Sequence, residues 1–204
     1  MFADNPDKDS QAPSNVFALA TPQHLLIKLA WEIGQLRRSF EVEQPIAWTH
    51  APAYHAFNCA VTCWHLSDWT WEAIDSQTKQ VVAERLGARL RTLEDFQGAL
   101  RTRHRALHIC WQIANGSKHF RLRKTDVDIQ TQNVWEYQPA MAGSMQAGEP
   151  LGSYRYRLVL TDKGQPIEAL ALFEESEGIW ARELASWFLI EPQGYVEGVP
   201  LRRL

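Results

Sequence analysis

The sequence predicts an α+β protein, in which an antiparallel bundle of helices precedes a small antiparallel sheet with one covering helix. Two patterns predict this fold. Apolar residues recur every three or four positions up to about residue 120, and after it they alternate with polar residues. The chain has 204 residues, of which 45% are hydrophobic and 22% charged, a composition typical of one globular domain with or without an appendage. We expect a disordered tail at 1–15, a helical bundle at 16–120, and a sheet with a helix at 121–204 packed on the bundle.

The first two helices of the bundle are predicted from proline and cap residues. Thr21 and Pro22 form a good helix start, because a Thr cap precedes a proline at the first helical position. This helix is expected to run to about Phe40. After a loop at 41–49, Pro52 begins a second helix that is expected to end near Trp71.

Two further helices complete the predicted bundle. Ser76 is expected to cap a short helix that Gly87 ends. Thr92 with Asp95 resembles a capping box, and the helix that it opens is expected to continue to Asn115-Gly116. Helices joined by such short loops pack most simply as antiparallel neighbours.

The remainder of the chain predicts strands and one helix. A strand is expected at 127–131, followed by a loop at 139–153. The segment 154–173 is expected to form a β-hairpin, with a strand at 154–160, a turn at Asp162-Lys163-Gly164 and a return strand at 167–173. Apolar residues from Ile179 to Phe188 predict an amphipathic helix over this sheet.

Composition excludes some classes of protein. No apolar run reaches the ~18–20 residues that span a bilayer, and residues 1–15 lack the apolar core of a signal peptide. Cys59, Cys63 and Cys110 lie in apolar helical surroundings, which predicts buried free thiols in a reducing cytoplasm. Zinc at the first two, near His65, would need a fourth ligand, so we expect neither metal nor cofactor.

A run of positive charge stands out in a chain whose net charge is −3. The segment 96–125 has no Asp or Glu, and its cations are Arg101, Arg103, Arg105, Lys118, Arg121, Arg123 and Lys124. Arg85, Arg89 and Arg91 precede it. A local cationic surface of this kind attracts polyanions such as RNA. The alternative is a solvated helix face whose charges are balanced by acids elsewhere in the fold.

Polar side chains interrupt the apolar stripes of the second and fourth helices. Asp68 falls on the stripe of Phe57, Val61, Trp64 and Trp71, with His65 on the next row. On the fourth helix, a row of polar residues contains His104, His108, Asn115 and His119. If these helices pack together, Asp68 and His65 meet Asn115, Lys118 or His119. Three interpretations remain open: a network that fixes helix register, a functional site, or a metal site that uses His104, His108 or His119.

The nine Trp residues permit a similar choice between packing and binding. We expect Trp64 and Trp111 to be core residues, and Trp48, Trp135, Trp180 and Trp187 to serve packing. Trp69, beside Asp68 and off the main stripe, is the better candidate for a pocket wall. An aromatic platform for a base beside a cationic surface is the functional alternative.

Two segments carry a family resemblance. Residues 60–69 (AVTCWHLSDW) and 113–120 (IANGSKHF) resemble motifs of a family of small uncharacterised bacterial and phage-associated proteins. The resemblance implies ligand-binding roles for His65, Asp68, Trp69, Asn115 and Lys118, and a functional role for His119. Its helical part is similar to HEPN domains, which are α-helical bundles that often act as RNases or nucleotide-binding modules.

The HEPN nuclease signature is an Arg followed, after four to six residues, by a His. Arg103 with His108 fits it, and so does Arg101 with His108. In such a site the His transfers the proton of a ribose 2′-OH and the Arg stabilises the charged transition state. We therefore expect His108, Arg103 and His119 as catalytic residues, and Arg101 and Arg105 as further RNA ligands.

The resemblance implies an HEPN-like RNA-interacting protein, and by extension a metal-independent RNase of a bacterial defence or toxin-like system. RNA or a nucleotide is the expected partner. Nucleases of this kind commonly pair two motifs in a dimer, so a homodimer is expected. The alternative is a non-catalytic dimeric module that binds a partner protein through its Trp-rich or hairpin surface.

Overall fold

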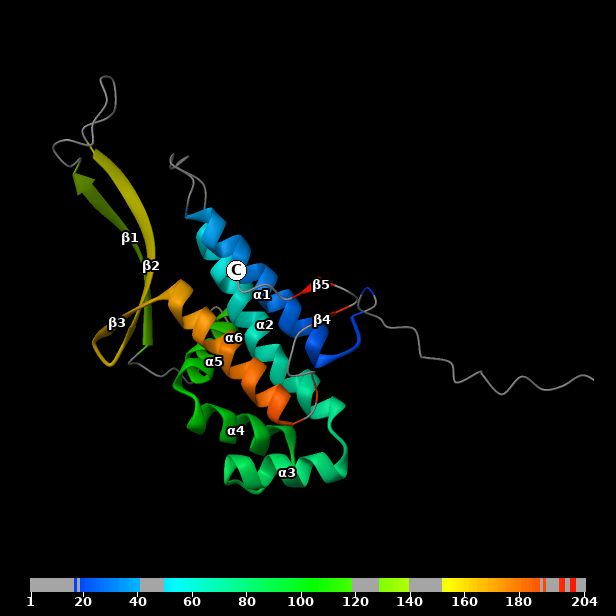
Figure 1. The fold of residues 1–204 in the computed structure, drawn as a ribbon. Coiled ribbons are helices and arrows are strands. Elements are labelled where there is room, and N and C mark those ends of the chain that lie inside the picture. The colour runs from blue at the N-terminus through cyan, green and yellow to red at the C-terminus, as the bar shows by residue number, and fades with distance from the viewer. Residues whose placement is uncertain are drawn as a thin grey trace, which may run out of the picture.

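A computed structural model describes residues 17, 19–40, 50–118, 129–139, 152–187, 189, 195–196 and 199–200 of the chain. In it a body of packed helices carries a long β-hairpin that projects beyond the helices (Figure 1). The α+β class is as predicted. The expected tail at 1–15 lies outside the described residues. Within those ranges, no helix has both the length and the apolar character needed to cross a membrane.

The first two helices form where the sequence predicts them. α1 spans Pro22–Ser39, and its cap Thr21 accepts a hydrogen bond from the backbone N–H of His24 at 3.2 Å. α2 spans Ala51–Ala73, close to the predicted bounds. The two helices pack side by side along their length (Figure 1).

The structure corrects the predicted cap of the third helix and confirms the predicted capping box of the fourth. α3 spans Ser76–Leu86, but its cap is Asp75 rather than Ser76, because the Asp75 carboxylate accepts from the N–H of Thr78 at 2.7 Å. Gly87 ends this helix with φ 63°, a left-handed conformation that suits glycine. α4 begins at Leu93 after the predicted capping box, in which Thr92 and Asp95 each accept from the other's backbone N–H.

The predicted fourth helix is two helices. α4 spans Leu93–Arg103 and α5 spans Arg105–Lys118, with His104 extended between them at φ −125° and ψ 104°. The break removes little hydrogen bonding, since the N–H of His104 still reaches the carbonyl of Leu100 and its carbonyl accepts from His108. No glycine or proline marks this position, so the apolar period alone predicted one continuous helix.

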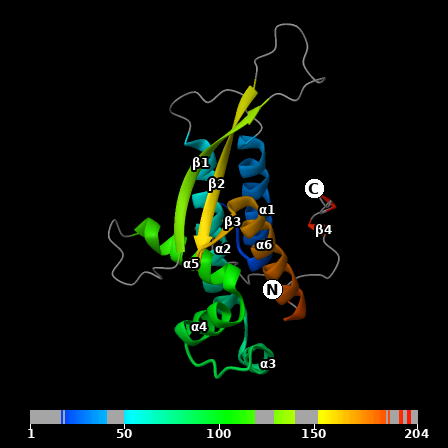
Figure 2. The ribbon, with the colours of Figure 1, turned by 90° about the vertical axis from the view of Figure 1, so that its left-hand side faces the viewer.

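The break follows from what the two halves bury. Phe96 and Leu100 are the buried residues of α4. α5 buries a wider stripe, namely Ala106, Leu107, Ile109, Cys110, Gln112 and Ala114. A change of direction at His104 lets α5 enter the interior between α2 and α6, while α4 stays across the end of the helical body (Figure 2).

The sheet has the predicted antiparallel topology but longer strands. β1 spans Ile129–Pro139, β2 spans Gly152–Asp162 and β3 spans Gln165–Glu168, in the spatial order β1-β2-β3. β1 and β2 pair over eleven residues, from Ile129 opposite Asp162 to Pro139 opposite Gly152. A separate pair, β4 (Tyr195–Val196) and β5 (Val199–Pro200), lies in the C-terminal segment.

The predicted turn is confirmed, and the predicted return strand is wrong beyond residue 168. Lys163 and Gly164 both have positive φ, at 50° and 79°, as a two-residue hairpin turn requires. The chain then becomes helical, and α6 spans Ala169–Ser186. The seven buried residues of this helix recur every three or four positions, so the helical period overrides the short alternation at 167–173: Ala169, Leu172, Phe173, Ser176, Ile179, Trp180 and Leu184.

α6 reaches well beyond the sheet that it was expected to cover. It contacts β2 and β3, and it also packs against α1, α2 and α5. Trp180 and, just after the helix, Trp187 are buried to 0% and 1% exposure, which confirms their predicted packing role. The Phe96 ring contacts Trp187 edge-on at 5.8 Å and stacks on Trp71 at 5.7 Å. This aromatic cluster joins α2, α4 and the end of α6.

Phe96→Ala should lower the free energy of unfolding by about 3–5 kcal/mol, because it opens a cavity between two indole rings. Phe57→Ala is the matched control, since Phe57 is 44% exposed and its truncation should cost about 1 kcal/mol or less. Denaturant unfolding measures both values. Similar losses for the two variants would contradict the proposed role of the cluster.

Candidate functional site

The predicted meeting of α2 with the basic region of the chain takes place. The rings of Trp64 and Trp111 lie 6.4 Å apart, and Ile113 and Phe57 line the same hollow. Ser67 and Asp68, further along α2, meet Gln97 of α4. α2 and α5 therefore run antiparallel. We define the α2–α4–α5 seam as His65, Asp68, Gln97, Arg101, His108 and Trp111, all of which are half-buried.

Asp68 has the hydrogen-bonding partner that its place on an apolar stripe demands. Gln97 donates from Nε2 to a carboxylate oxygen of Asp68 at 3.0 Å, and the same nitrogen lies 2.9 Å from Oγ of the buried Ser67. This described partner comes from α4. An amide that bridges two side chains of α2 fixes the register of α4 against it.

The described part of the second predicted motif, 113–118, lies toward the other end of α2. Because the helices run antiparallel, Asn115 and Lys118 of α5 lie toward the first half of α2, away from Asp68. Asn115 is half-buried. The side chain of Lys118 and the whole of His119 lie outside the described residues. The expected meeting of Asp68 and His65 with Asn115, Lys118 or His119 therefore stays a prediction, and the contact that the structure describes for Asp68 is with Gln97.

Arg101, Trp111 and His108 form a compact group on the seam. The guanidinium carbon of Arg101 lies 4.1 Å from the centre of the Trp111 ring, and its Nε donates to the carbonyl of Gln97 at 3.3 Å. The His108 ring lies 5.3 Å from the same indole. Burial lowers the pKa of Arg101, although the group stays charged. A cation, an imidazole and an aromatic ring thus share one half-exposed site.

The basic side chains around the helix break are paired with acids from distant parts of the chain. Nε2 of His104 lies 2.9 Å from Oε1 of Glu183, and Nε of Arg103 lies 3.6 Å from the same oxygen. Arg105 makes a two-pronged ion pair with Asp162, with its Nε 2.9 Å from the carboxylate. Arg103 and Arg105 are thus balanced by acids elsewhere in the fold, as the alternative interpretation expects. Together with His104 they link the helix break to α6 and β2.

Helical geometry divides the remaining positive charge between two surfaces. Arg101 and Arg103 are two positions apart in α4, or about 200° around the axis, so they point to opposite sides. Arg103 lines a hollow of about 470 Å³ between α3 and α4, together with Arg89, Asp95 and Thr102. Arg85, Arg89 and Arg91 are exposed around it. Among the basic side chains that the structure describes, Arg101 thus lies on a different surface from Arg103 and Arg89.

The other predicted residues serve packing. Trp64 is 5% exposed, and Trp69 and Trp71 are half-buried against the core. Trp69 is thus placed on the core rather than at a pocket wall. Trp48 lies outside the described residues, as does the side chain of Trp135.

The three cysteines are free and buried, as predicted. Sγ of Cys110 lies 3.4 Å from Oγ of Ser176 on α6. Burial raises the pKa of the Cys63 thiol, and Cys110 beside it raises the pKa further. Thiols in such surroundings are poor nucleophiles. Among the described residues, no three His, Cys, Asp or Glu side chains are grouped so that they would hold a metal ion.

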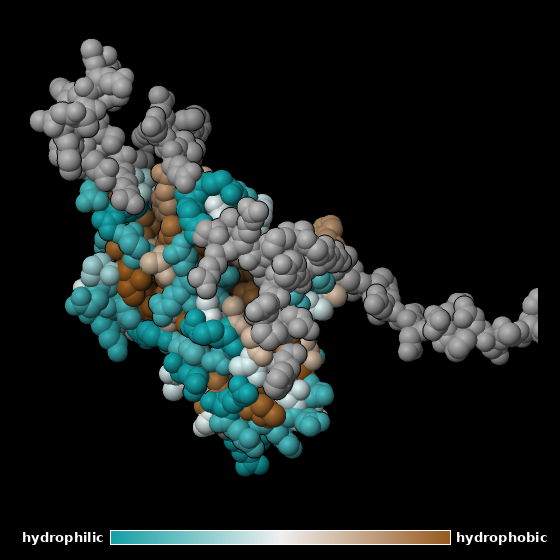
Figure 3. Space-filling view, in the orientation of Figure 1, coloured by the Kyte–Doolittle hydropathy of each residue, from teal (hydrophilic) through white to brown (hydrophobic). Residues whose placement is uncertain are grey.

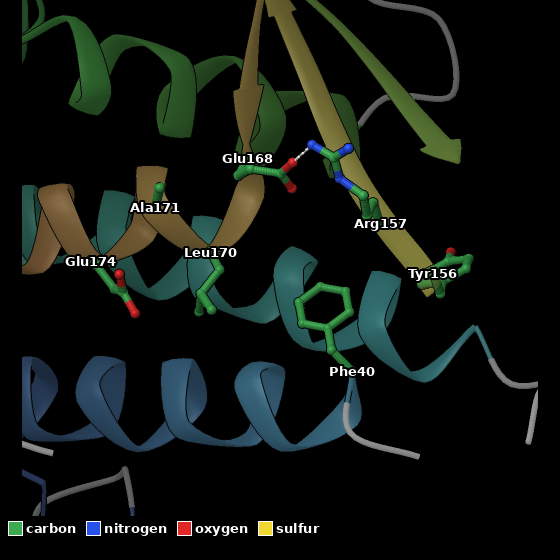
Figure 4. Close-up of a pocket in the computed structure, with 7 residues that line it drawn as sticks. All are labelled: Phe40, Tyr156, Arg157, Glu168, Leu170, Ala171 and Glu174. Carbon is green, nitrogen blue, oxygen red and sulfur yellow. Dashed lines mark hydrogen bonds and ion pairs between the residues drawn. The ribbon is translucent and has the colours of Figure 1, made fainter. Parts of the chain in front are cut away.

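A further hollow, of about 460 Å³, lies between the end of α1, the start of α6 and β2 (Figure 4). Phe40, Tyr156 and Leu170 form its apolar wall, and part of this apolar surface is visible between the hairpin and the helices (Figure 3). Its charges are already paired: Arg157 binds Glu168, and Glu174 accepts from Arg37 at 2.7 Å. None of the predicted site residues lines this hollow.

Two residues that organise the seam were missed by sequence reasoning. Gln97 looked like an ordinary polar residue of a basic helix, and Glu183 lies 79 positions from its partner His104. Only an acid-free segment of 30 residues, which must find its counter-charges elsewhere, signalled that distant carboxylates were needed.

Glu183 should make stability depend on pH. The hydrogen bond from His104 and the charge of Arg103 lower the pKa of Glu183 from its ordinary value of 4.5. A lowered folded-state pKa stabilises the protein above the unfolded value and loses that effect as the pH falls through the folded one. Glu183→Gln should therefore lower the melting temperature at pH 6, and the deficit should shrink below about pH 4. Glu175→Gln, at an exposed position of the same helix, should show no such trend. A deficit that is constant with pH would contradict the pairing.

Comparison with known proteins offers no guide to this site. No family model, curated protein or solved structure matches the chain. The function of the α2–α4–α5 seam therefore has to be inferred from its own residues.

Proposed function

We propose that the chain is an HEPN-like RNA-interacting protein that binds single-stranded RNA at the α2–α4–α5 seam. The observation that carries this proposal is the stacking of Arg101 on Trp111, with His108 beside the same ring. Single-stranded RNA offers both groups that such a site recognises. An unstacked base packs on an indole, and a phosphate accepts from a guanidinium.

The exposure of these residues supports binding over simple packing. Trp111 is half-buried, whereas its neighbour Trp64 is 5% exposed. Arg101 holds its guanidinium over the ring without an acidic partner among the described ion pairs, in contrast to Arg103 and Arg105. The carboxylate of Glu94 acts on the Arg101 charge without forming one of the described ion pairs, so a phosphate that approaches Arg101 breaks no described ion pair.

We further propose metal-independent cleavage at this site, with Arg101 in place of Arg103 as the arginine of the signature. His108 takes the proton of the ribose 2′-OH, whose oxygen then attacks phosphorus as the bond to the 5′-oxygen breaks. Arg101 stabilises the extra negative charge. A second group must protonate the departing oxygen, and His65 and His119 are the candidates. A reducing cytoplasm is the proposed setting, because it keeps the three thiols free.

RNA binding tests the site through a matched pair of variants. Arg101→Gln should raise the Kd for a fluorescein-labelled single-stranded RNA about tenfold, and should lower the slope of log Kd against log salt by about 1, because one phosphate contact is lost. Trp111→Ala should weaken binding by a similar factor. Arg89→Gln makes the same change on the other side of α4 and should change Kd by less than about twofold. Fluorescence anisotropy measures all three, with melting temperatures as a control for folding.

Two outcomes of the binding experiment would contradict the proposed RNA site. Equal losses for Arg89→Gln and Arg101→Gln would indicate diffuse attraction to basic residues, and no binding by the native chain would end the proposal.

Cleavage is tested separately, with labelled RNA in the presence of EDTA. His108→Ala should abolish cleavage while RNA binding remains within about threefold of the native value, because the imidazole acts on the 2′-OH proton. Arg101→Gln should slow cleavage more than Arg103→Gln does. His119→Ala tests the candidate acid. Full activity of His108→Ala would overturn the catalytic assignment, and binding without cleavage would leave an RNA-binding module.

A further inference from the structure

Among the residues that the structure describes, β1 is an open edge strand. The described sheet has the order β1-β2-β3, so β1 pairs with a strand on one side only. Four consecutive residues, 130–133, are all exposed, and so is Glu136. Because successive side chains of a strand point to opposite faces, such a run means that neither face of β1 is covered there. An apolar hollow of about 180 Å³ separates this strand from Phe57 of α2 and Ile113 of α5.

The other edge of the same sheet is protected. β3 has four residues, includes Pro166, and turns directly into α6. Short length and proline are common devices that stop an edge from pairing with another chain. β1 has eleven residues, its pairing with β2 shows no bulge, and its proline is the terminal Pro139. The strand contains no Lys or Arg. β1 therefore lacks the devices that β3 has.

The side chains of β1 are suited to pairing with themselves. Glu136 is the one charged residue of the strand, and Arg157 of β2 donates to it at 3.0 Å. Val134 stands at the middle of the strand. An antiparallel pair of β1 strands related by a two-fold axis at Val134 would set valine against valine. It would also set Gln132 against Glu136, with no like charges opposed.

We propose that a second copy of this chain pairs with β1 across a two-fold axis near Val134, and so joins the two sheets into one. The ordered pairing satisfies the outward backbone groups of both strands. This dimer is independent of the proposed RNA function, since the α2–α4–α5 seam contributes no residue to it.

Because this register sets Gln132 opposite Glu136 of the other copy, the stability of the dimer should depend on the charge at position 132. Gln132→Glu places a second carboxylate opposite Glu136 at two symmetry-related points of the dimer, and should raise its Kd about fivefold or more. Gln132→Lys places opposite charges together and should lower the Kd. The same two changes at Gln165, which is exposed on β3, should have no effect. Sedimentation equilibrium measures each Kd against a monomer mass of 23.4 kDa.

A covalent trap tests the same contact without relying on affinity. Val134→Cys should form a disulfide-linked dimer under mild oxidation by oxidised glutathione, which accepts the two electrons, whereas Gln165→Cys should not. The three native cysteines are buried and will not compete. Circular dichroism establishes that each variant is folded.

Three outcomes would overturn the proposal. The first is a native chain that stays monomeric at every concentration up to about 0.5 mM, where a Kd near 1 mM would already give a detectable fraction of dimer. The second is a dimer that responds equally to changes at Gln132 and Gln165, which would use another surface. The third is a monomer that instead binds an extended peptide at β1, which would assign the edge to a different protein.

Discussion

The burial of α6 among α1, α2 and α5 is the constraint on which the rest of the structure depends. Its apolar face, with Leu172, Phe173 and Trp180 fully buried, fills the interior that the earlier helices enclose. Each large side chain of this kind stabilises the fold by about 1.5–3 kcal/mol when it leaves water. The same helix begins directly after β3 and contacts β2, so it also holds the sheet on the helical body. A helix that follows the hairpin in sequence thus packs against three helices that precede it.

The polar structure follows from this packing. Once α6 lies against α5, Glu183 meets His104 and Arg103 at the helix break, and Asp162 at the end of β2 meets Arg105. These pairs neutralise part of the acid-free segment and leave Arg101 on the opposite side of α4. A cluster of basic residues in a sequence therefore does not by itself predict a single basic surface. The fold pairs some of these residues with acids and places others on different sides of a helix. What survives is a smaller site, in which an arginine, an indole and an imidazole are in contact.

Local signals predicted the helices that begin at Thr21, Pro52 and Thr92, the end at Gly87, and the turn at Lys163-Gly164. Each depends on neighbouring residues alone, and for that reason the sequence reveals it. The break at His104 and the early start of α6 at Ala169 depend on what each segment packs against, so periodicity misjudged both. The sequence predicted part of the candidate site. Asp68 needed a partner, and Gln97 supplies one, but the contact between α2 and α4 depends on how the helices pack, which the sequence does not reveal.

The extended His104 has a consequence for any reaction at the seam. Arg101 and His108 belong to separate rigid segments, and the two backbone dihedral angles of one residue determine their relative orientation. The imidazole of that residue is bound to Glu183, so α6 controls the angle at which α4 meets α5. The contact between Glu183 and His104 thus joins α6 to the residue that lies between the segments carrying the guanidinium and the imidazole. A change that breaks the contact between His104 and Glu183 would therefore alter the orientation of α4 relative to α5. The geometry of the seam would change although no residue of the seam is substituted.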